Sequence, residues 1–174
     1  MNIYGEKVLL RAIEPSDNKL LLDLINDPNT EKMLGGSSFP VSEVEQAKWI
    51  CDQMGRQDAL RCIIVDRAAT EKCIGTIILS DIDRKNGNAQ VHLKLLQAGR
   101  GKGYGTDALK AVVNYAFHQL RLHCVYAHVL DYNVPSQKLF QKCGFQREGV
   151  LKHRIFKDGA YIDLISYSVT YDEA

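Results

Sequence analysis

The ten residues Gln97-Ala98-Gly99-Arg100-Gly101-Lys102-Gly103-Tyr104-Gly105-Thr106 form a glycine-rich, basic turn between a strand pattern and a helix pattern. Residues 89–96 before it are rich in apolar side chains. After it, apolar residues recur with helical spacing at Leu109, Val112, Val113, Ala116, Phe117 and Leu120. Free N–H groups at a helix start bind anions, and glycines let a phosphate approach the backbone closely. Because Arg100 and Lys102 add positive charge, the turn predicts a pyrophosphate-binding loop.

Two common glycine-rich motifs do not fit this turn. A P-loop would close with Gly-Lys-Ser/Thr, which is missing here. The dinucleotide fingerprint G-x-G-x-x-G would need a glycine where the chain has Thr106, which disfavours a nucleotide-binding oxidoreductase. On the loop alone, a glycine-rich helix start that binds no ligand is still an alternative.

The composition bounds the class of protein. A chain of 174 residues suits a single domain, 1–174, with one sizeable core. Its 22 Lys and Arg balance 21 Asp and Glu, so bulk charge indicates neither a nucleic-acid nor a membrane partner. We also see no signal-peptide core and no membrane-length apolar run. Five scattered cysteines without a C-x-x-C pair favour reduced thiols in a cytoplasmic protein and disfavour a metal site.

Periodicity and turn signals divide the chain into alternating strands and helices. One helix is expected from Pro15-Ser16-Asp17 to Asp27-Pro28, and a capping box, Ser42-x-x-Glu45, starts a second that ends near Gly55. A flexible loop, 35–40, separates them. A helix follows the glycine-rich turn, and a short one spans 135–142. Strands are expected at 7–12, 60–66, 73–82, 89–96, 124–130, 145–156 and 161–169, with hairpin turns at Asn86-Gly87 and Asp158-Gly159.

The order of these elements, β-α-α-β-β-β-α-β-α-β-β, predicts an α+β fold with a mixed sheet and helices on its faces. Two motifs make the chain resemble a known family. Arg100-x-x-Gly103-x-Gly105 is similar to the (Q/R)-x-x-G-x-(G/A) signature of the GCN5-related N-acetyltransferases (GNAT). The second motif, N-x-x-S-x-x-L-Y-x-x-x-G-F, is matched from Asn133 to Phe145. The tail, from Glu148-Gly149 to Gly159-x-Tyr161-x-Asp163, looks like the branch with ribosomal-protein (RimJ/RimL-like) and spermidine acetyltransferases.

The resemblance implies a fold and a reaction. The fold is a mostly antiparallel sheet of about seven strands, splayed between the fourth, 89–96, and the fifth, 124–130. The reaction is direct attack of a primary amine on the thioester of acetyl-coenzyme A (acetyl-CoA), with no metal. The acceptor is a protein N-terminus, an amino sugar or a small amine. Family members often form dimers, so a homodimer is the assembly that the resemblance suggests.

The resemblance also assigns cofactor-binding residues. The loop wraps the pyrophosphate, and the end of the fourth strand pairs with pantetheine, where an N–H near Leu95 polarises the thioester carbonyl. Simple core packing explains Leu93 and Leu95 equally well, and Asn133 before Val134-Pro135 is also a good helix cap. The full implied set is Leu93, Lys94, Leu95, Arg100, Gly101, Lys102, Gly103, Tyr104, Gly105, Thr106, Asn133, Ser136, Phe140 and Lys142.

Phe140 departs from the family pattern, because many members carry there a tyrosine that protonates the leaving thiolate. Three interpretations follow. The thiolate leaves unaided, with Ser136 or water assisting; Tyr132 or another hydroxyl substitutes; or the domain is a non-catalytic acetyl-CoA sensor. We favour the first, since acid–base assistance contributes only about 10²–10⁴-fold.

An amine with a pKa of about 10 must lose a proton before it attacks, so a base is expected. Gln90 stands where spermidine-type relatives have glutamate. His128 is then the best-placed titratable group, although a strand histidine is also often structural. Asp81, Asp83 and His92 are weaker candidates.

The acceptor is less defined. Polyamines need carboxylates, but Gln90 is uncharged and the covering loop, 34–40, is neutral. The sequence therefore disfavours a polyamine. Phe39 and Trp49 either line an acceptor pocket or pack in the core.

Overall fold

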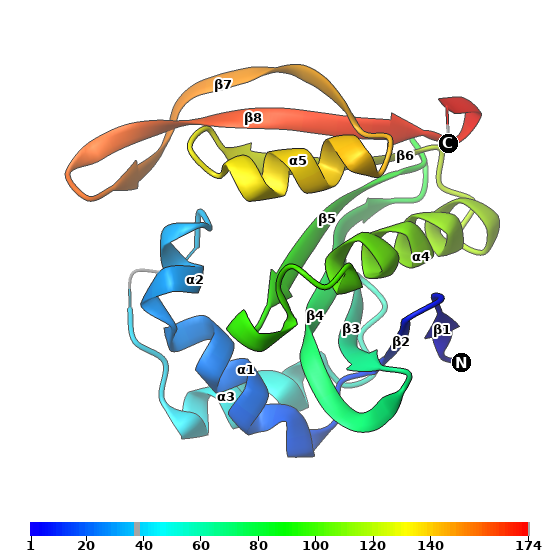
Figure 1. The fold of residues 1–174 in the computed structure, drawn as a ribbon, viewed down its shortest axis with the longest axis vertical. Coiled ribbons are helices and arrows are strands. Elements are labelled where there is room, and N and C mark those ends of the chain that lie inside the picture. The colour runs from blue at the N-terminus through cyan, green and yellow to red at the C-terminus, as the bar shows by residue number, and fades with distance from the viewer. Residues whose placement is uncertain (37–38, 174) are drawn as a thin grey trace.

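The computed structural model describes residues 1–36 and 39–173, so two positions of the predicted loop 35–40, Ser37 and Ser38, lie outside the described residues. The described chain forms one eight-stranded sheet in the order β1-β2-β3-β4-β5-β6-β8-β7 (Figure 1). The strands are β1 (Ile3–Tyr4), β2 (Val8–Ala12), β3 (Leu60–Asp66), β4 (Ala69–Asp83), β5 (Asn88–Leu95), β6 (Cys124–Leu130), β7 (Gln146–Lys157) and β8 (Ala160–Thr170). The helices are α1 (Asn18–Asn26), α2 (Pro28–Lys32), α3 (Glu43–Gln53), α4 (Tyr104–His118) and α5 (Val134–Lys142).

Helices cover both faces of the sheet, as the sequence predicted. Alternation along β3 shows this directly, because Ile64 belongs to the core that α4 covers, whereas Ile63 and Val65 pack on the opposite face with Leu21 of α1 and Ile50 of α3. The predicted α+β class is therefore confirmed.

The strand pairs are antiparallel except for β5 and β6, which run parallel. This parallel pair is short. It begins at Asn88↔Cys124 and ends at Gln90↔Tyr126, although both strands continue for several residues. The predicted splay between these two strands is thus present, and it opens directly after Gln90 (Figure 1).

The structure adds two short elements that the sequence did not reveal. β1 has two residues and α2 has five, too few for a periodic pattern. The predicted helix does end at Asp27, but Asp27 then caps α2 by accepting the N–H groups of Asn29 and Thr30. Leu96, predicted in a strand, follows β5 and donates its N–H to the Ile74 carbonyl at 2.9 Å. β4 is longer than predicted.

The five cysteines are free. Across residues 1–36 and 39–173, no three His, Cys, Asp or Glu side chains are grouped as a metal would require. In the same part of the chain, every helix is too short or too polar to cross a bilayer.

Candidate cofactor cavity and active site

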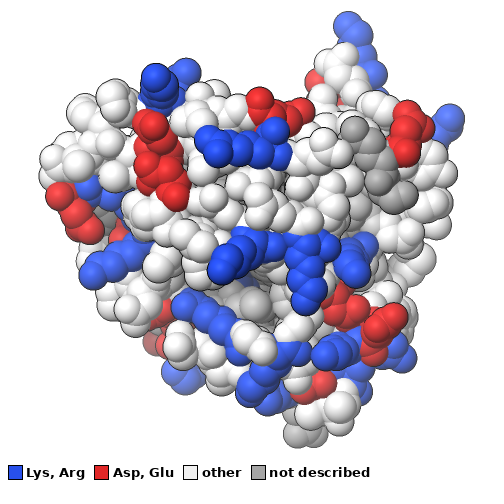
Figure 2. Space-filling view, turned by 45° about the horizontal axis from the view of Figure 1, so that its top comes forward, with Lys and Arg blue, Asp and Glu red and all other residues white. Residues whose placement is uncertain are grey.

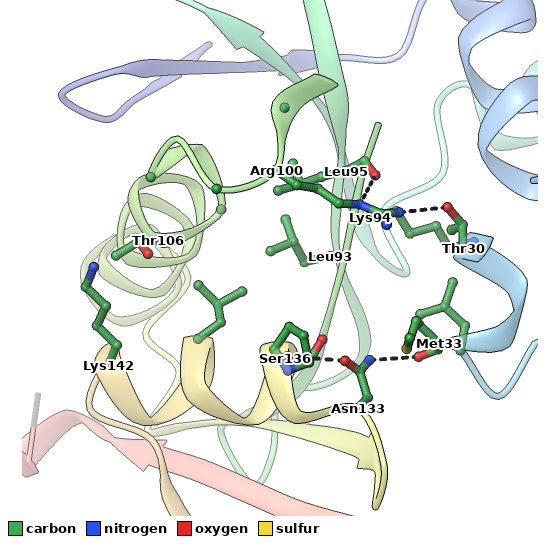
Figure 3. A pocket seen from close by; sticks show the side chains of 17 residues that line it. Thr30, Met33, Leu93, Lys94, Leu95, Arg100, Thr106, Asn133, Ser136 and Lys142 are labelled. Atoms are coloured by element: carbon green, nitrogen blue, oxygen red, sulfur yellow. Dashed lines mark hydrogen bonds between the residues drawn. The ribbon is translucent and has the colours of Figure 1, made fainter. Parts of the chain in front are cut away.

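A cavity of about 440 Å³ lies where the end of β5, the glycine-rich loop, α2 and α5 meet (Figure 3). It brings together most of the residues predicted from the loop, the strand and the second motif. Its lining comprises Thr30, Met33, Leu34, Leu93, Lys94, Leu95, Gly99, Arg100, Gly101, Gly103, Gly105, Thr106, Asn133, Pro135, Ser136, Leu139 and Lys142.

The loop presents free backbone donors to this cavity. α4 begins at Tyr104, and its N-cap, Gly103, has a φ of 84° and no side chain with which to cap the helix. In the described part of the chain, the N–H groups of residues 101–106 have no acceptor. A helix start with unpaired N–H groups carries partial positive charge and binds anions. The loop therefore has the form that its sequence predicted.

Gly105 keeps the wall of the cavity close to β5. A Cβ at this position would lie 3.2 Å from the Leu95 side chain and 3.3 Å from that of Leu93. These contacts are tighter than ordinary van der Waals contacts, so a larger residue would require the ends of the two leucine side chains or the start of α4 to shift. The absence of a side chain at Gly105 thus allows the start of α4 to lie close to β5 at the cavity.

The lining of the cavity is basic. Lys94, Arg100 and Lys142 contribute to it, whereas none of its described lining residues is Asp or Glu. Figure 2 shows a hollow near the middle of one face with Lys and Arg side chains around it. Desolvation by burial lowers the pKa of Lys94. In Figure 3, Lys142 extends from α5 toward Thr106 at the start of α4. Such a lining favours a ligand with several negative charges.

Some of the predicted loop side chains face elsewhere. The Tyr104 hydroxyl donates to Asp66 at 2.6 Å and does not line the cavity. Lys102 is exposed and also outside the lining. Arg100 lines the cavity, but its guanidinium donates to the Leu95 carbonyl, the Gln97 side chain and the Thr30 hydroxyl at 3.2, 3.2 and 3.0 Å. Arg100 therefore ties the loop to β5 and α2.

Backbone groups of β5 face the gap beside β6. The N–H of Leu96 points to Ile74 of β4, and successive residues of a strand point their N–H groups to opposite sides. The N–H groups of Leu95 and Leu93 consequently point away from β4, beyond the last pair with β6 at Gln90. An extended, amide-rich ligand in the gap would find strand-like partners there.

The second motif contributes Asn133 and Ser136. Asn133 is buried; its side chain accepts the Ser136 N–H at 3.2 Å and donates to the Met33 carbonyl at 3.0 Å (Figure 3). Asn133 therefore caps α5 and holds the segment after α2. The Ser136 side chain lines the cavity and makes no hydrogen bond within the described residues.

Phe140 is not a cavity residue. It is 5% exposed and packs against Phe145 and Tyr167, with ring centroids 5.0 and 6.4 Å apart. On α5 the cavity is instead lined by Pro135 and Leu139, and Leu139 lies one turn after Ser136. Leu139 was not predicted as a cavity residue, although its spacing from Ser136 puts it on this face of the helix. Leu34 was expected only in the loop that covers the acceptor, and nothing in the sequence indicated Thr30 or Met33.

The candidate bases lie on the sheet face toward α1 and α3. His128 is exposed and lies beside Tyr126, with ring centroids 5.5 Å apart, outside the cavity lining. His92 is also exposed, and its Nε2 lies 2.8 Å from the Ser80 hydroxyl. Tyr132, considered as a substitute acid, donates to the Lys32 carbonyl at 2.5 Å and does not line the cavity.

A second cavity of about 400 Å³ lies on this same face, between β4, α1 and α3. It shares Lys94 with the first cavity. Most of its other lining is apolar, and both Phe39 and Trp49 belong to it, as the sequence suggested for an acceptor pocket.

Comparison with known proteins identifies a family. Residues 7–146 match the acetyltransferase (GNAT) domain family. A prophage-derived uncharacterized N-acetyltransferase of Bacillus subtilis is 34% identical over 169 residues, which cover 97% of this chain and 93% of that protein. The spermidine N(1)-acetyltransferase of Vibrio cholerae is 27% identical, covering 92% and 91% of the two chains.

A solved structure of spermidine N-acetyltransferase from Vibrio cholerae, in complex with CoA and spermine, has the same fold. Its TM-score is 0.89 at 24% identity, with 97% of this chain and 98% of that chain covered. Together with the family match over most of the chain, these similarities lead to one conclusion. The chain belongs to the GNAT family of acetyltransferases and is an N-acetyltransferase.

Proposed function

We propose that this N-acetyltransferase transfers the acetyl group of acetyl-CoA, bound in the cavity between β5 and α5, to a small primary amine. The observation that carries the proposal is the row of free N–H groups at residues 101–106, opening into a basic cavity that reaches the parted strands. The relative from Vibrio cholerae, whose structure contains CoA, supports the choice of ligand.

Each part of the cofactor has matching groups. Residues 101–106 bind the diphosphate through N–H groups, with the Lys142 ammonium nearby. The N–H and C=O groups of Leu93 pair with the pantetheine amides, and the N–H at Leu95 polarises the thioester carbonyl. Arg100 and Asn133 act indirectly, because their side chains hold the loop, α2 and α5 in place.

The chemistry requires few protein groups. The amine nitrogen attacks the thioester carbon, the new C–N bond forms, and the C–S bond breaks. The coenzyme thiolate departs and then takes a proton. Of the other hydroxyls in the lining, Thr106 belongs to the diphosphate loop and Thr30 is bonded to Asp27 and Arg100. We therefore assign Ser136 to the departing sulfur, because Phe140 lies in the core and the Tyr132 hydroxyl is already bound to Lys32.

The second cavity is the acceptor site of this proposal. Its carboxylate, Glu45, accepts the N–H and hydroxyl of Ser42 in a capping box, and its amine, Lys94, offers a polycation no negative charge. An amine with an apolar body therefore fits better than a polyamine, in contrast to the acceptor of the spermidine acetyltransferases. The free cysteines are consistent with a cytoplasmic setting, and a homodimer stays a prediction from the family.

A panel of amines tests the proposal. The protein is mixed with acetyl-CoA and apolar primary amines, polyamines, amino sugars or peptides, and free thiol is followed with time. We expect thiol release with apolar amines above all. Tight acetyl-CoA binding without release for any amine would favour the sensor alternative, and absence of binding would overturn the proposal itself.

A further inference from the structure

A chain of hydrogen bonds crosses the sheet beside the point where the strands part. The Ser80 hydroxyl of β4 lies 2.9 Å from Asp81 Oδ2 and 2.8 Å from His92 Nε2 of β5. The last β5–β6 pair is Gln90↔Tyr126, so His92 is the next β5 residue on this face. His92 lines neither cavity, but its β4 partner Ile78 and its same-face neighbour Lys94 both line the second one.

The geometry fixes the direction of these hydrogen bonds. An ionised carboxylate only accepts, so the single hydroxyl proton of Ser80 is donated to Asp81. The Ser80 oxygen then accepts from His92, which requires the proton on Nε2. A neutral His92 therefore keeps its lone pair on Nδ1, where it is able to take a proton.

A β-bulge explains how Asp81 joins this group. Neighbouring strand residues normally point to opposite faces, which would direct Asp81 away from Ser80 and His92. The β4–β5 register shifts between Ser80 and Asp83, and Asp81 has a φ of 51°, a conformation that is uncommon for a residue other than glycine. Bulges of this kind redirect side chains and are frequent next to active sites.

The surroundings of His92 favour its neutral form. Although exposed at its edge, the ring lies among enough protein atoms that desolvation lowers its pKa below the usual 6.5. The charges that face it are Asp81 of β4, which raises the pKa, and Lys94 of β5 and His128 of β6, which lower it. Tyr126 of β6 belongs to the same face.

We propose that His92 is the general base of the acetyl transfer, with Ser80 and Asp81 as the residues that position it. The inference rests on the proposed function. Nδ1 takes the proton of the attacking amine as the C–N bond forms and the C–S bond breaks. The resulting imidazolium is stabilised through Nε2–H, the Ser80 hydroxyl and the Asp81 carboxylate. His128, the candidate that the sequence favoured, has no comparable hydrogen-bond partner in the described chain.

Kinetics of five variants test this assignment: His92→Gln, Ser80→Ala, Asp81→Asn, His128→Ala and the control His123→Gln. Each is measured from pH 5.5 to 9 with two amines of different pKa. In the wild type, kcat should fall on the acidic side of the pH–rate profile, below pH 6.5, as His92 is protonated. His92→Gln should lower kcat by about 10²–10⁴-fold, leave the Kd for CoA unchanged and abolish this acidic limb. Ser80→Ala and Asp81→Asn should lower kcat less and shift that limb. The exposed His123→Gln is the control and should behave as wild type. The two amines show which group causes the acidic limb. A limb caused by protonation of the amine shifts with the pKa of the amine, whereas one caused by His92 does not.

The assignment is overturned if His92→Gln keeps kcat and the limb, or if His128→Ala is the variant that removes it. An imidazole ¹⁵N spectrum of the wild type gives a second readout that does not depend on turnover. Nε2–H with unprotonated Nδ1 at pH 8 is expected, and the opposite tautomer would contradict the proposal. If the wild type binds no acetyl-CoA, the proposed function fails. The ¹⁵N spectrum would still test the hydrogen bonds between His92, Ser80 and Asp81, because the tautomer does not depend on acetyl-CoA.

Discussion

The Arg100 guanidinium donates a hydrogen bond to the Thr30 hydroxyl at 3.0 Å, although 70 residues separate the two in the chain. This contact joins the glycine-rich loop to α2. Three further contacts hold α2 and the residue after it: Tyr132 donates to the Lys32 carbonyl, Asn133 to the Met33 carbonyl, and Lys157 pairs with Glu31. Hydrogen bonds and an ion pair therefore attach α2 to three segments: the glycine-rich loop, the β6–α5 turn and the β7–β8 hairpin.

The first prediction concerns this attachment of α2. Arg100→Met removes the donors to Leu95, Gln97 and Thr30, so residues 28–33 should exchange amide hydrogens faster. The Kd for CoA should rise roughly tenfold, the effect of losing about 1.4 kcal/mol. Hydrogen exchange and calorimetric titration check the two effects. Lys110→Met on the exposed side of α4 is the control for lost charge, and an equal change in that variant would contradict the role of Arg100.

The second prediction concerns the loop backbone. Gly103 has a φ of 84°, and its Cβ would approach the Lys7 ammonium at 3.2 Å, so Gly103→Val should distort the loop and abolish measurable CoA binding. Gly159 has nearly the same φ, 81°, at an open hairpin tip with no atom within 4 Å. Both valine variants should lose about 1–2 kcal/mol of stability, but only Gly103→Val should lose CoA. Binding that survives in Gly103→Val would exclude the loop as the diphosphate site.

The third prediction separates the two hydrogen bonds of Asn133. Asn133→Ala loses the helix cap and the donor to Met33, and should lower the free energy of unfolding by about 1–3 kcal/mol. Asn133→Asp keeps a capping oxygen but loses that donor, so it should recover part of the helix stability while α2 stays loosened. Urea unfolding reports the first effect, and hydrogen exchange near Met33 reports the second. Equal stability of the two variants would mean that the cap contributes little.

The sequence predicted those parts of the molecule whose signals are local. The amphipathic α4, the Ser42–Glu45 capping box and the Asn86-Gly87 and Asp158-Gly159 turns each depend on neighbouring residues, and all are present. The parted strands followed from the family resemblance. Thr30 and Met33 were missed because long-range hydrogen bonds bring a five-residue helix to the loop, and no spacing rule encodes such contacts.

Side-chain roles were harder to predict than positions. Arg100 and Asn133 occur where the motifs place them, but their polar groups bond to Thr30 and Met33. Phe140 was expected at the cofactor, yet the helix turns it toward Phe145 and Tyr167. His92 was ranked below His128 because no sequence pattern reveals the β-bulge at Asp81. The bulge brings Asp81 to Ser80, which is the hydrogen-bond partner of His92.

The last prediction concerns pH and the ion pair between Arg11 and Asp17, the residue directly before α1. Burial alone would raise the pKa of Asp17, but two hydrogen bonds of 2.8 Å from Arg11 and one from the Glu14 N–H outweigh it and lower the pKa below the usual 3.8. A lowered carboxyl pKa stabilises the fold above pH 3.8, and this contribution is lost as the pH falls through the folded-state value. The free energy of unfolding of the wild type should therefore fall as the pH drops from 3.8 to the folded-state pKa of Asp17.

Asp17→Asn should cost about 3 kcal/mol at pH 7, because it leaves the 25% exposed Arg11 side chain beside a neutral partner. The difference in unfolding free energy between wild type and variant should narrow below pH 3.8. There the Asp17 carboxyl of the unfolded wild type takes up a proton, whereas the folded state, with its lowered pKa, resists protonation. Asp23→Asn, in the exposed pair with Lys19, is the matched control and should change stability by less than about 1 kcal/mol. Urea unfolding at pH 7 and pH 3 measures all three proteins. A gap that stays constant between the two pH values would show that the charge of Asp17 does not contribute, and that its hydrogen bonds alone hold the start of α1.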